Sequence, residues 1–557
     1  MKERYIALME KALSAYSDEH IKRYFDEVRE VGLTEHGFPR LTSNIGILIS
    51  QGIRTDLLPI FLQMMEFCCK TIPTVKAAND FSVREIINCL LAVEQSGAVS
   101  PEDTQRWRKY LASIEPTTCY TQFATDPADD IRNWALFTGV SEHFRARAGL
   151  CDNADFVDLQ VESQLKFFDD NAMYMDHKGS DVHHPLVYDL VTRGLLAMLL
   201  NNGYRGKHYD RVDALLKKSA LLTLKMQSPS GEIGFGGRSN QFIHNEAWLV
   251  TVFEYEAKRY AKEGNFELAA QFKAAIERAV AVSERWLAKE PIRHIKNRFP
   301  TETKYGCEGY AYFDKYMITV ASMIHAAYLI CDDLIPYECE SDLSSCVFET
   351  SEHFHKLFVK SSGYSLEFDL NADLGYDASG LGRVHKADAA TTVCLSVPCP
   401  FGTSYCLDLK NPFPFAMCSA IETDGEYRLG SECASKYEVT DTFADESSAG
   451  ATLVWYFDGG KTVTEKYLVN GEGVSVSLLG EGRIAYAFPA FFFDGETHPE
   501  IAVNENTLSV SYEGSTCLYT TDGKIIDFDK TVGNRNGHYK VFLATAENSL
   551  DFKIEIK

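Results

Sequence analysis

One glycine-rich loop, residues 228–246, carries more chemically versatile side chains than any other short stretch of the chain. A proline and four glycines interrupt an otherwise helical pattern here, and glycine permits tight turns and a close approach to a ligand. We therefore expect the loop to form one wall of a substrate cleft. Its polar and titratable side chains are Glu232, Arg238, Asn240, Gln241, His244, Asn245 and Glu246.

The end of this loop has the spacing of a helix start. If a helix begins near Phe242, then Gln241, His244 and Asn245 fall on one face of its first turn. Free N–H groups at a helix N-terminus favour a carboxylate, which Arg238 could also bind, while His244 could accept a proton. The structural alternative is that polar side chains of the loop simply cap the helix.

A second dense cluster occupies residues 304–316, where two glycines, four tyrosines and Glu308 precede a predicted helix. Tyr310 and Tyr312 lie on the loop side of that helix. A tyrosine can transfer a proton in catalysis when its surroundings favour the exchange. Packing of aromatic rings under a loop is the alternative for each of these tyrosines.

Residues 171–184 form a third polar segment and contain three histidines. His177 and His183 could line the same cleft. Together with Asp176, Asp181 and His184 they could also hold a metal ion, but the spacing matches no diagnostic ligand pattern. We therefore predict a substrate-binding loop with neither a metal nor a cofactor. A plain solvated loop is the structural alternative.

Two further pairs of residues could contact a sugar. Asn133 and Trp134 open a predicted helix, so that the amide could bind a carboxylate and the indole could stack on a sugar ring. Arg383 and His385 follow a glycine-rich segment in the second half of the chain and could reach the cleft from there. A core tryptophan and incidental charges in a hairpin are the structural alternatives.

The elements that must position these residues fall into two classes. From residue 3 to about residue 333, apolar residues recur at spacings of three and four in roughly a dozen segments, which predicts helices joined by short loops. A complete and an incomplete α/α toroid (barrel) fit this pattern equally well. We place this all-helical domain at residues 1–334 and a linker at 335–350. Alternating apolar residues and turn signals then predict an antiparallel β-sandwich over residues 351–557.

Charge and cysteine usage limit the partners and the location of the chain. The formal net charge is −24 and no block of basic residues occurs, which argues against nucleic acid and anionic membranes as partners. The 15 cysteines are scattered without Cys-x-x-Cys pairs, a usage typical of reduced proteins. With no apolar run of signal-peptide or membrane-spanning character, we expect a cytoplasmic protein, with a homo-oligomer as a possibility.

This order of a helical toroid and a β-sandwich resembles the α/α-toroid polysaccharide lyases, among them heparinase II/III-like, chondroitin and alginate lyases. Asn133-Trp134 is similar to the Asn-Trp helix opening of some of these lyases, and residues 228–245 to their glycine-rich loop with a following histidine. The resemblance implies β-elimination on uronic-acid-containing oligo- or polysaccharides. In that reaction Asn245 and Arg238 would neutralise the carboxylate, His244 would act as base and Tyr310 as acid.

Two other functions remain open at this point. An inverting glycoside hydrolase, similar to a β-glucuronidase, would use paired carboxylates. Glu232, Glu246 and Glu308 are available for this role, and Asp176 or Asp314 could partner one of them. A non-catalytic carbohydrate-binding protein is the second alternative, although it would need fewer titratable groups. In all three cases the expected partner is an oligosaccharide, and the lyase and the uronidase require an anionic one.

Overall fold

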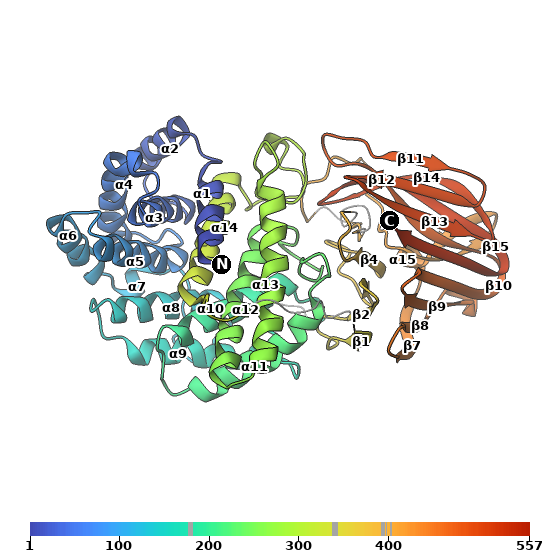
Figure 1. Ribbon diagram of the computed structural model, residues 1–557, viewed down its shortest axis with the longest axis horizontal. Helices are drawn as coiled ribbons and strands as arrows, with labels where there is room; N and C mark the ends of the chain where they lie inside the picture. Colours follow the sequence, from blue (N-terminus) through green and yellow to red (C-terminus); the bar gives the residue numbers. More distant parts are fainter. Residues whose placement is uncertain (177–181, 337–343, 391–395, 397, 402–403, 411) are drawn as a thin grey trace.

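The computed structural model describes residues 1–176, 182–336, 344–390, 396, 398–401, 404–410 and 412–557. Helices occupy the chain as far as Ile330, and antiparallel strands follow from Cys346 onward (Figure 1). The first strand therefore begins inside the segment predicted as a linker. Helices first and antiparallel sheets second is the fold class predicted from the sequence, and the structure confirms it.

Six helices form a closed inner ring. Each contacts the next in chain order, and the last returns to the first, so that the toroid is complete. The sequence had left a complete and an incomplete ring equally open. The ring helices are α3 (Gly37–Ser50), α5 (Asn79–Ser96), α8 (Trp134–Arg147), α10 (Leu186–Asn201), α12 (His244–Lys262) and α14 (Phe313–Ile330).

Outer helices alternate with the inner ones along the chain. The helix α1 packs against α14, α4 against α3, α9 against α8, and α13 against α12, whereas α6 contacts α4 and α5, and α11 contacts α10 and α12. The outer helices are α1 (Lys2–Leu13), α4 (Leu58–Thr71), α6 (Pro101–Ala112), α9 (Ala154–Gln164), α11 (Tyr209–Met226) and α13 (Phe266–Leu287), with α2 (Asp18–Val31) and the short α7 (Pro116–Cys119) between them.

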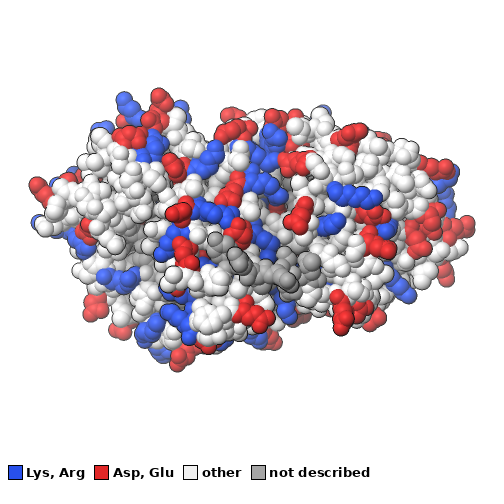
Figure 2. Space-filling model, in the orientation of Figure 1, with Lys and Arg blue, Asp and Glu red and all other residues white. Residues whose placement is uncertain are grey.

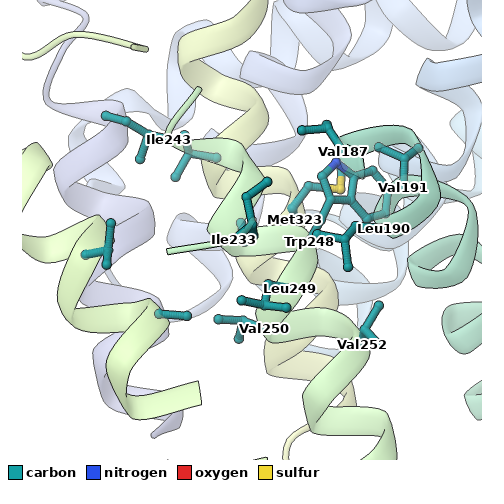
Figure 3. Packing of buried hydrophobic residues seen from close by; sticks show 14 of the residues in the cluster. Val187, Leu190, Val191, Ile233, Ile243, Trp248, Leu249, Val250, Val252 and Met323 are labelled. Atoms are coloured by element: carbon teal, nitrogen blue, oxygen red, sulfur yellow. The ribbon is translucent and has the colours of Figure 1, made fainter. Parts of the chain in front are cut away.

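Apolar packing holds the inner helices against one another. They are apolar on nearly all sides because they have neighbours on nearly all sides. Trp248 of α12 lies beside Val187 and Val191 of α10 and close to Met323 of α14 (Figure 3). The ring of Trp248 also covers Gly194, where a Cβ atom would lie 2.5 Å from it, so this close approach of α10 and α12 requires a glycine.

Two antiparallel sheets follow the toroid. The four-stranded sheet, in the order β1-β2-β3-β4, lies between the helices and the larger sheet (Figure 1). Phe368 of β3 and Tyr467 of β9 meet between the two sheets with ring centroids 4.8 Å apart. The strands of the smaller sheet are β1 (Cys346–Glu349), β2 (Lys356–Ser361), β3 (Tyr364–Asp369) and β4 (Gly380–Lys386).

The larger sheet has 11 strands, with the long strands β10 and β15 paired at its centre. Its main path runs β11-β12-β13-β15-β10-β9-β8-β7, while β14 pairs with β15, β5 with β10, and β6 with β5. The strands are β5 (Cys418–Thr423), β6 (Glu426–Leu429), β7 (Lys436–Ala444), β8 (Ala449–Tyr456), β9 (Thr462–Asn470), β10 (Gly473–Phe493), β11 (Glu500–Val503), β12 (Thr507–Tyr512), β13 (Ser515–Thr521), β14 (Lys524–Asn534) and β15 (Gly537–Ile556).

Basic and acidic side chains are mixed over the visible surface of the molecule, where Lys and Arg are interspersed with Asp and Glu (Figure 2). No helix in the described part of the chain is both long and apolar enough to cross a membrane.

Candidate active site

A cavity of about 450 Å³ lies where the N-terminal ends of all six inner helices meet. Its volume is in the range of small-ligand sites, about 300–1,000 Å³. Helix N-termini carry partial positive charge and free N–H groups, so six of them around one space favour a negatively charged ligand. The residues that these helix starts contribute are His36, Arg40, Ala78, Phe81, Asn133, Trp134, Phe137, Val187, Tyr188, Val191, His244, Trp248, Lys315, Tyr316 and Thr319.

Three hydroxyl groups meet at one side of the cavity. The Tyr310 hydroxyl lies 2.5 Å from Ser239 Oγ and 3.5 Å from the Tyr188 hydroxyl, and Tyr188 lies 3.3 Å from the same serine. Burial, together with Tyr188 and Glu308, raises the pKa of Tyr310 well above its usual range. The phenol is therefore protonated near neutral pH, which is the state a proton donor requires, although it gives up its proton less readily than a free tyrosine.

His244 is the first residue of α12 and lines the cavity. Its imidazole is buried, with its centroid 5.6 Å from that of Tyr316, and Nδ1 has no hydrogen-bond partner among the described residues. Burial, with Arg40 as the next contribution, lowers the pKa of His244 to about 3. The ring is therefore neutral at physiological pH, which is the state a base requires, although burial makes it a weaker base than a free imidazole.

Asp176 is fixed between two of the predicted binding residues. Its Oδ1 accepts a hydrogen bond from Asn133 Nδ2 at 2.7 Å, and its Oδ2 lies 3.2 Å from Arg238 Nη2. Burial raises the pKa of Asp176, while Arg238 acts in the opposite direction. The Arg238 guanidinium also lies over the Tyr188 ring at 4.4 Å and keeps 30% of its side chain exposed, so it remains accessible to a ligand.

The two glutamates predicted as catalytic lie outside the cavity lining. Glu308 is buried and bound by Arg535 at 2.6 and 3.0 Å, and it accepts a hydrogen bond from the Ser239 backbone N–H at 2.6 Å. Glu246 is fully buried and pairs with Lys296 at 2.5 Å. Among the described residues that line the cavity, Asp176 is the one carboxylate.

Three polar residues of the glycine-rich loop, Asn240, Gln241 and Asn245, do not line the cavity. The helix α12 begins at His244, and Gln241 precedes it with a φ of +66°, so Gln241 does not share a helical face with His244 and Asn245 as predicted. Asn245 is fully buried and donates a hydrogen bond to the Ser239 carbonyl at 3.0 Å. Asn240 and Gln241 border a separate space of about 20 Å³, which is too small for a sugar.

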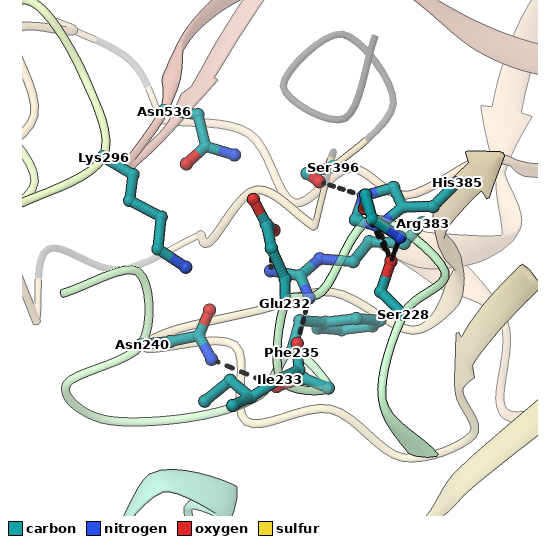
Figure 4. A network of polar contacts seen from close by, with 12 residues as sticks. Ser228, Glu232, Ile233, Phe235, Asn240, Lys296, Arg383, His385, Ser396 and Asn536 are labelled. Atoms are coloured by element: carbon teal, nitrogen blue, oxygen red, sulfur yellow. Dashed lines mark hydrogen bonds and ion pairs between the residues drawn. The ribbon is translucent and has the colours of Figure 1, made fainter. Parts of the chain in front are cut away.

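Arg383 and His385 lie in β4 and bind the rear of the same loop (Figure 4). Arg383 Nη1 donates to the Ile233 carbonyl at 2.7 Å, and His385 Nδ1 lies 2.6 Å from Ser228 Oγ. Both side chains are almost completely buried. They position the loop from the β domain and do not line the cavity.

Two of the remaining predicted residues, Tyr312 and His183, do not line the cavity. Tyr312 is exposed, and His183 packs against His355 with ring centroids 5.3 Å apart. His177 lies outside the described residues, as does Asp181. Within the described part of the chain, no three metal-binding side chains gather in one place.

The cavity also contains residues that sequence reasoning missed. His36, Arg40, Lys315 and Tyr316 lie at the starts of α3 and α14, together with Tyr188 of α10. Their position along the sequence could have identified them, because each of these polar residues lies at or just after the start of a strongly apolar helix. That signal becomes informative only when all inner helices are known to point their N-termini at one space.

Several solved structures resemble this chain over most of its length. The sequence matches no protein-family model and no curated protein. A chondroitin AC lyase variant of Streptomyces coelicolor aligns over 99% of this chain and 79% of its own, with 9% identity and a TM-score of 0.48. A heparinase III aligns over 93% of this chain and 78% of its own, with 10% identity and a TM-score of 0.47. A heparan sulfate lyase variant of Pedobacter heparinus aligns over 93% of this chain and 76% of its own, with 9% identity and a TM-score of 0.42.

These neighbours include the heparinase III and chondroitin lyases to which the sequence was found similar. At identities of 9–10% and TM-scores of 0.42–0.48, the likeness gives no information on activity.

Proposed function

We propose that this protein is a lyase that cleaves uronic-acid-containing oligo- or polysaccharides by β-elimination. The supporting observation is the composition of the cavity: six helix N-termini, accessible cationic and hydroxyl groups, and a single carboxylate among the described lining residues. Such a site favours an anionic sugar over a neutral one. It also supplies a proton donor and a proton acceptor of the kind that elimination needs.

Neutralisation of the substrate carboxylate is the first requirement, because it acidifies the adjacent C5 proton. Arg238 is the main candidate, since its guanidinium lines the cavity and is partly exposed. Asn133 takes the place that the sequence assigned to Asn245, because Asn133 lines the cavity and Asn245 is buried behind it. The helix N-termini add to the stabilisation of the negative charge that develops on the carboxylate.

Proton transfer then involves two residues with defined protonation states. The neutral His244 removes the C5 proton, a double bond forms between C4 and C5, and the bond from C4 to the leaving oxygen breaks. The Tyr310 hydroxyl gives its proton to that oxygen, so charge balances in each step. Exchange of protons with water afterwards returns both groups to their starting states.

The alternative of an inverting hydrolase has less support. It requires two carboxylates on opposite sides of the scissile bond, typically about 6.5–9.5 Å apart. Glu246 and Glu308 are both buried in ion pairs away from the cavity, and Asp176 is bound by Asn133 and Arg238. A purely sugar-binding protein would explain the cavity but does not require that both a proton donor and a proton acceptor line it.

One assay separates these three functions. The protein is incubated with a panel of uronic-acid oligosaccharides while ultraviolet absorbance and reducing ends are followed together. An unsaturated product absorbs, so growth of absorbance with new reducing ends supports the lyase. Reducing ends without absorbance would establish a hydrolase, and binding without either would leave a carbohydrate-binding protein.

A further inference from the structure

One side of the cavity is built from the starts of α3 and α14 and has no role in the elimination described above. We call it the α3–α14 wall; it consists of His36, Arg40, Lys315 and Thr319. These helices are neighbours in the ring. Asn133 lies at the start of α8. In the ring of six inner helices, α8 is three places away from α14 and thus lies across the cavity from it.

Arg40 is the centre of the α3–α14 wall. It is buried, with 3% of its surface exposed, and its Nη1 donates a hydrogen bond to Thr319 Oγ1 at 2.7 Å. Its Nε lies 3.7 Å from Glu85 Oε1, which is too far for a hydrogen bond, and has no other partner among the described residues. A buried guanidinium with an unsatisfied donor is costly, and an anion in the adjoining cavity would stabilise its charge.

The charges around Arg40 leave an excess of positive charge. Glu85 is shared between Arg40 and Arg84, which hydrogen-bonds to it directly. Lys315, the other cation of the wall, is influenced by Glu35, whose two oxygens already accept hydrogen bonds from Tyr24 and the Gly37 backbone. Arg40 and Lys315 line the cavity, whereas Arg84 and both glutamates lie outside its lining, so a ligand at this wall meets the two cations first.

His36 adds a titratable group to this wall. It is the N-cap residue of α3, it is buried, and its Nδ1 has no hydrogen-bond partner among the described residues. Burial, followed by Arg40, Lys315 and His244, lowers the pKa of His36 well below its usual range. The nearby carboxylates Glu35 and Glu85 do not overcome this effect. A bound anion would oppose it, because an opposite charge nearby favours the protonated ring.

We propose that the α3–α14 wall is a second anion subsite, which binds a sulfate ester or a second carboxylate on a sugar next to the uronate that is cleaved. This assignment rests on the proposed function in one respect only, namely that the molecule carrying the anionic group is a sugar. The substrate is thus an oligosaccharide with at least two anionic groups, one near Arg238 and one near Arg40 and Lys315. The carboxylate of Asp176 is bound by Asn133 and Arg238, which are not part of this wall.

Binding of inorganic sulfate and of acetate tests the subsite without any turnover. Trp134 and Trp248 line the cavity, so their fluorescence reports occupancy in the intact protein. A bound sulfate should raise the lowered pKa of His36, and by linkage sulfate should bind more tightly at about pH 5.5 than at about pH 8. The variant Lys315→Met should weaken sulfate binding about tenfold, the effect of one lost charge-assisted hydrogen bond.

Two further variants control this result. His36→Gln should abolish most of the pH dependence while keeping a polar group in place. Lys304→Met removes the same charge as Lys315→Met, but from an exposed residue over the Tyr312 ring and outside the cavity, and should bind sulfate as the wild type does. Thermal unfolding of each variant checks that the fold is intact.

The outcomes distinguish the subsite from the lyase activity. Sulfate or acetate binding that depends on Lys315 and His36 supports the subsite, and the preferred anion identifies a sulfate ester or a carboxylate. Failure of both anions to bind the wild type, or equal binding by the wild type and both wall variants, overturns it. Lyase activity is measured separately, by ultraviolet absorbance with unsulfated uronates. The lyase proposal can therefore be supported when the subsite proposal fails, and the subsite proposal when the lyase proposal fails.

Discussion

Glu308 of the helical domain and Arg535 of the β domain form a buried ion pair with two hydrogen bonds, of 2.6 and 3.0 Å. Glu308 also accepts a hydrogen bond from the Ser239 backbone, and the Ser239 hydroxyl contacts that of Tyr310. The turn between β14 and β15 is thereby connected to the proposed proton donor. The β domain thus completes the site, although none of the described residues that line the cavity comes from it.

Breaking this pair should misplace Tyr310 without removing it. We expect Arg535→Met to lower kcat about tenfold to a hundredfold, with a smaller effect on KM, because misalignment of a reacting group costs rate more than binding. Removal of one partner of a buried pair should also destabilise the fold by about 3–5 kcal/mol. Kinetics and denaturant unfolding measure the two effects. An unchanged kcat in a folded variant would show that the pair does not position the donor.

Loss of the Tyr310 hydroxyl should stop proton donation to the leaving oxygen. We expect Tyr310→Phe to reduce kcat by about 10²–10⁴-fold, the usual contribution of general acid catalysis, with KM changed little. Tyr312→Phe is the matched control, since Tyr312 lies close in sequence but is exposed and outside the cavity. Equal rates in the two variants would exclude Tyr310 as the donor.

The role of Arg238 can be tested by removing the charge either from Arg238 or from the substrate carboxylate. Arg238→Gln should lower kcat/KM about a hundredfold on a free uronate, because the developing negative charge loses a charge-assisted hydrogen bond. On a substrate with methyl-esterified carboxyl groups, the same substitution should have a much smaller effect. A loss of equal size on both substrates would show that Arg238 does not act on the carboxylate.

Buried His244 should make the fold sensitive to acid. The unfolded state takes up a proton near pH 6.5, whereas the folded state resists it until the pH is near the lowered pKa of about 3. The unfolded state therefore binds more protons in this window, and stability falls as the pH is lowered through it, by up to about 1.4 kcal/mol per unit. Denaturant midpoints over this range measure the slope.

The variant His244→Gln should reduce this slope by removing one of the buried histidines. His498→Gln, at an exposed position, serves as the control and should leave it unchanged. If both variants retained the wild-type slope, the acid sensitivity would have to come from other buried groups, such as His294, whose pKa is also lowered by burial.

The sequence predicted the architecture because local patterns determine it. Apolar spacing identified the helices, and alternation with turn signals identified the sheets. The closure of the ring depends on the contact between α3 and α14, which are separated by more than 250 residues and leave no local trace. The order of domains was predictable, whereas the completeness of the toroid was not.

The site was predictable only in part, for the same reason. Arg238, His244 and Tyr310 were proposed from dense polar loops, and the structure brings them to one cavity together with Asn133. The burial of Glu308 could not be foreseen, since its partner lies 227 residues away in the chain. The positive φ of Gln241 likewise depends on tertiary packing around the loop.

The most direct test of the central claim is the ultraviolet absorbance of the products that wild-type protein and Tyr310→Phe release from uronic-acid oligosaccharides. The lyase mechanism predicts an absorbing, unsaturated product with the wild type and a loss of at least about a hundredfold in the variant. New reducing ends without absorbance, at similar rates for both proteins, would contradict it.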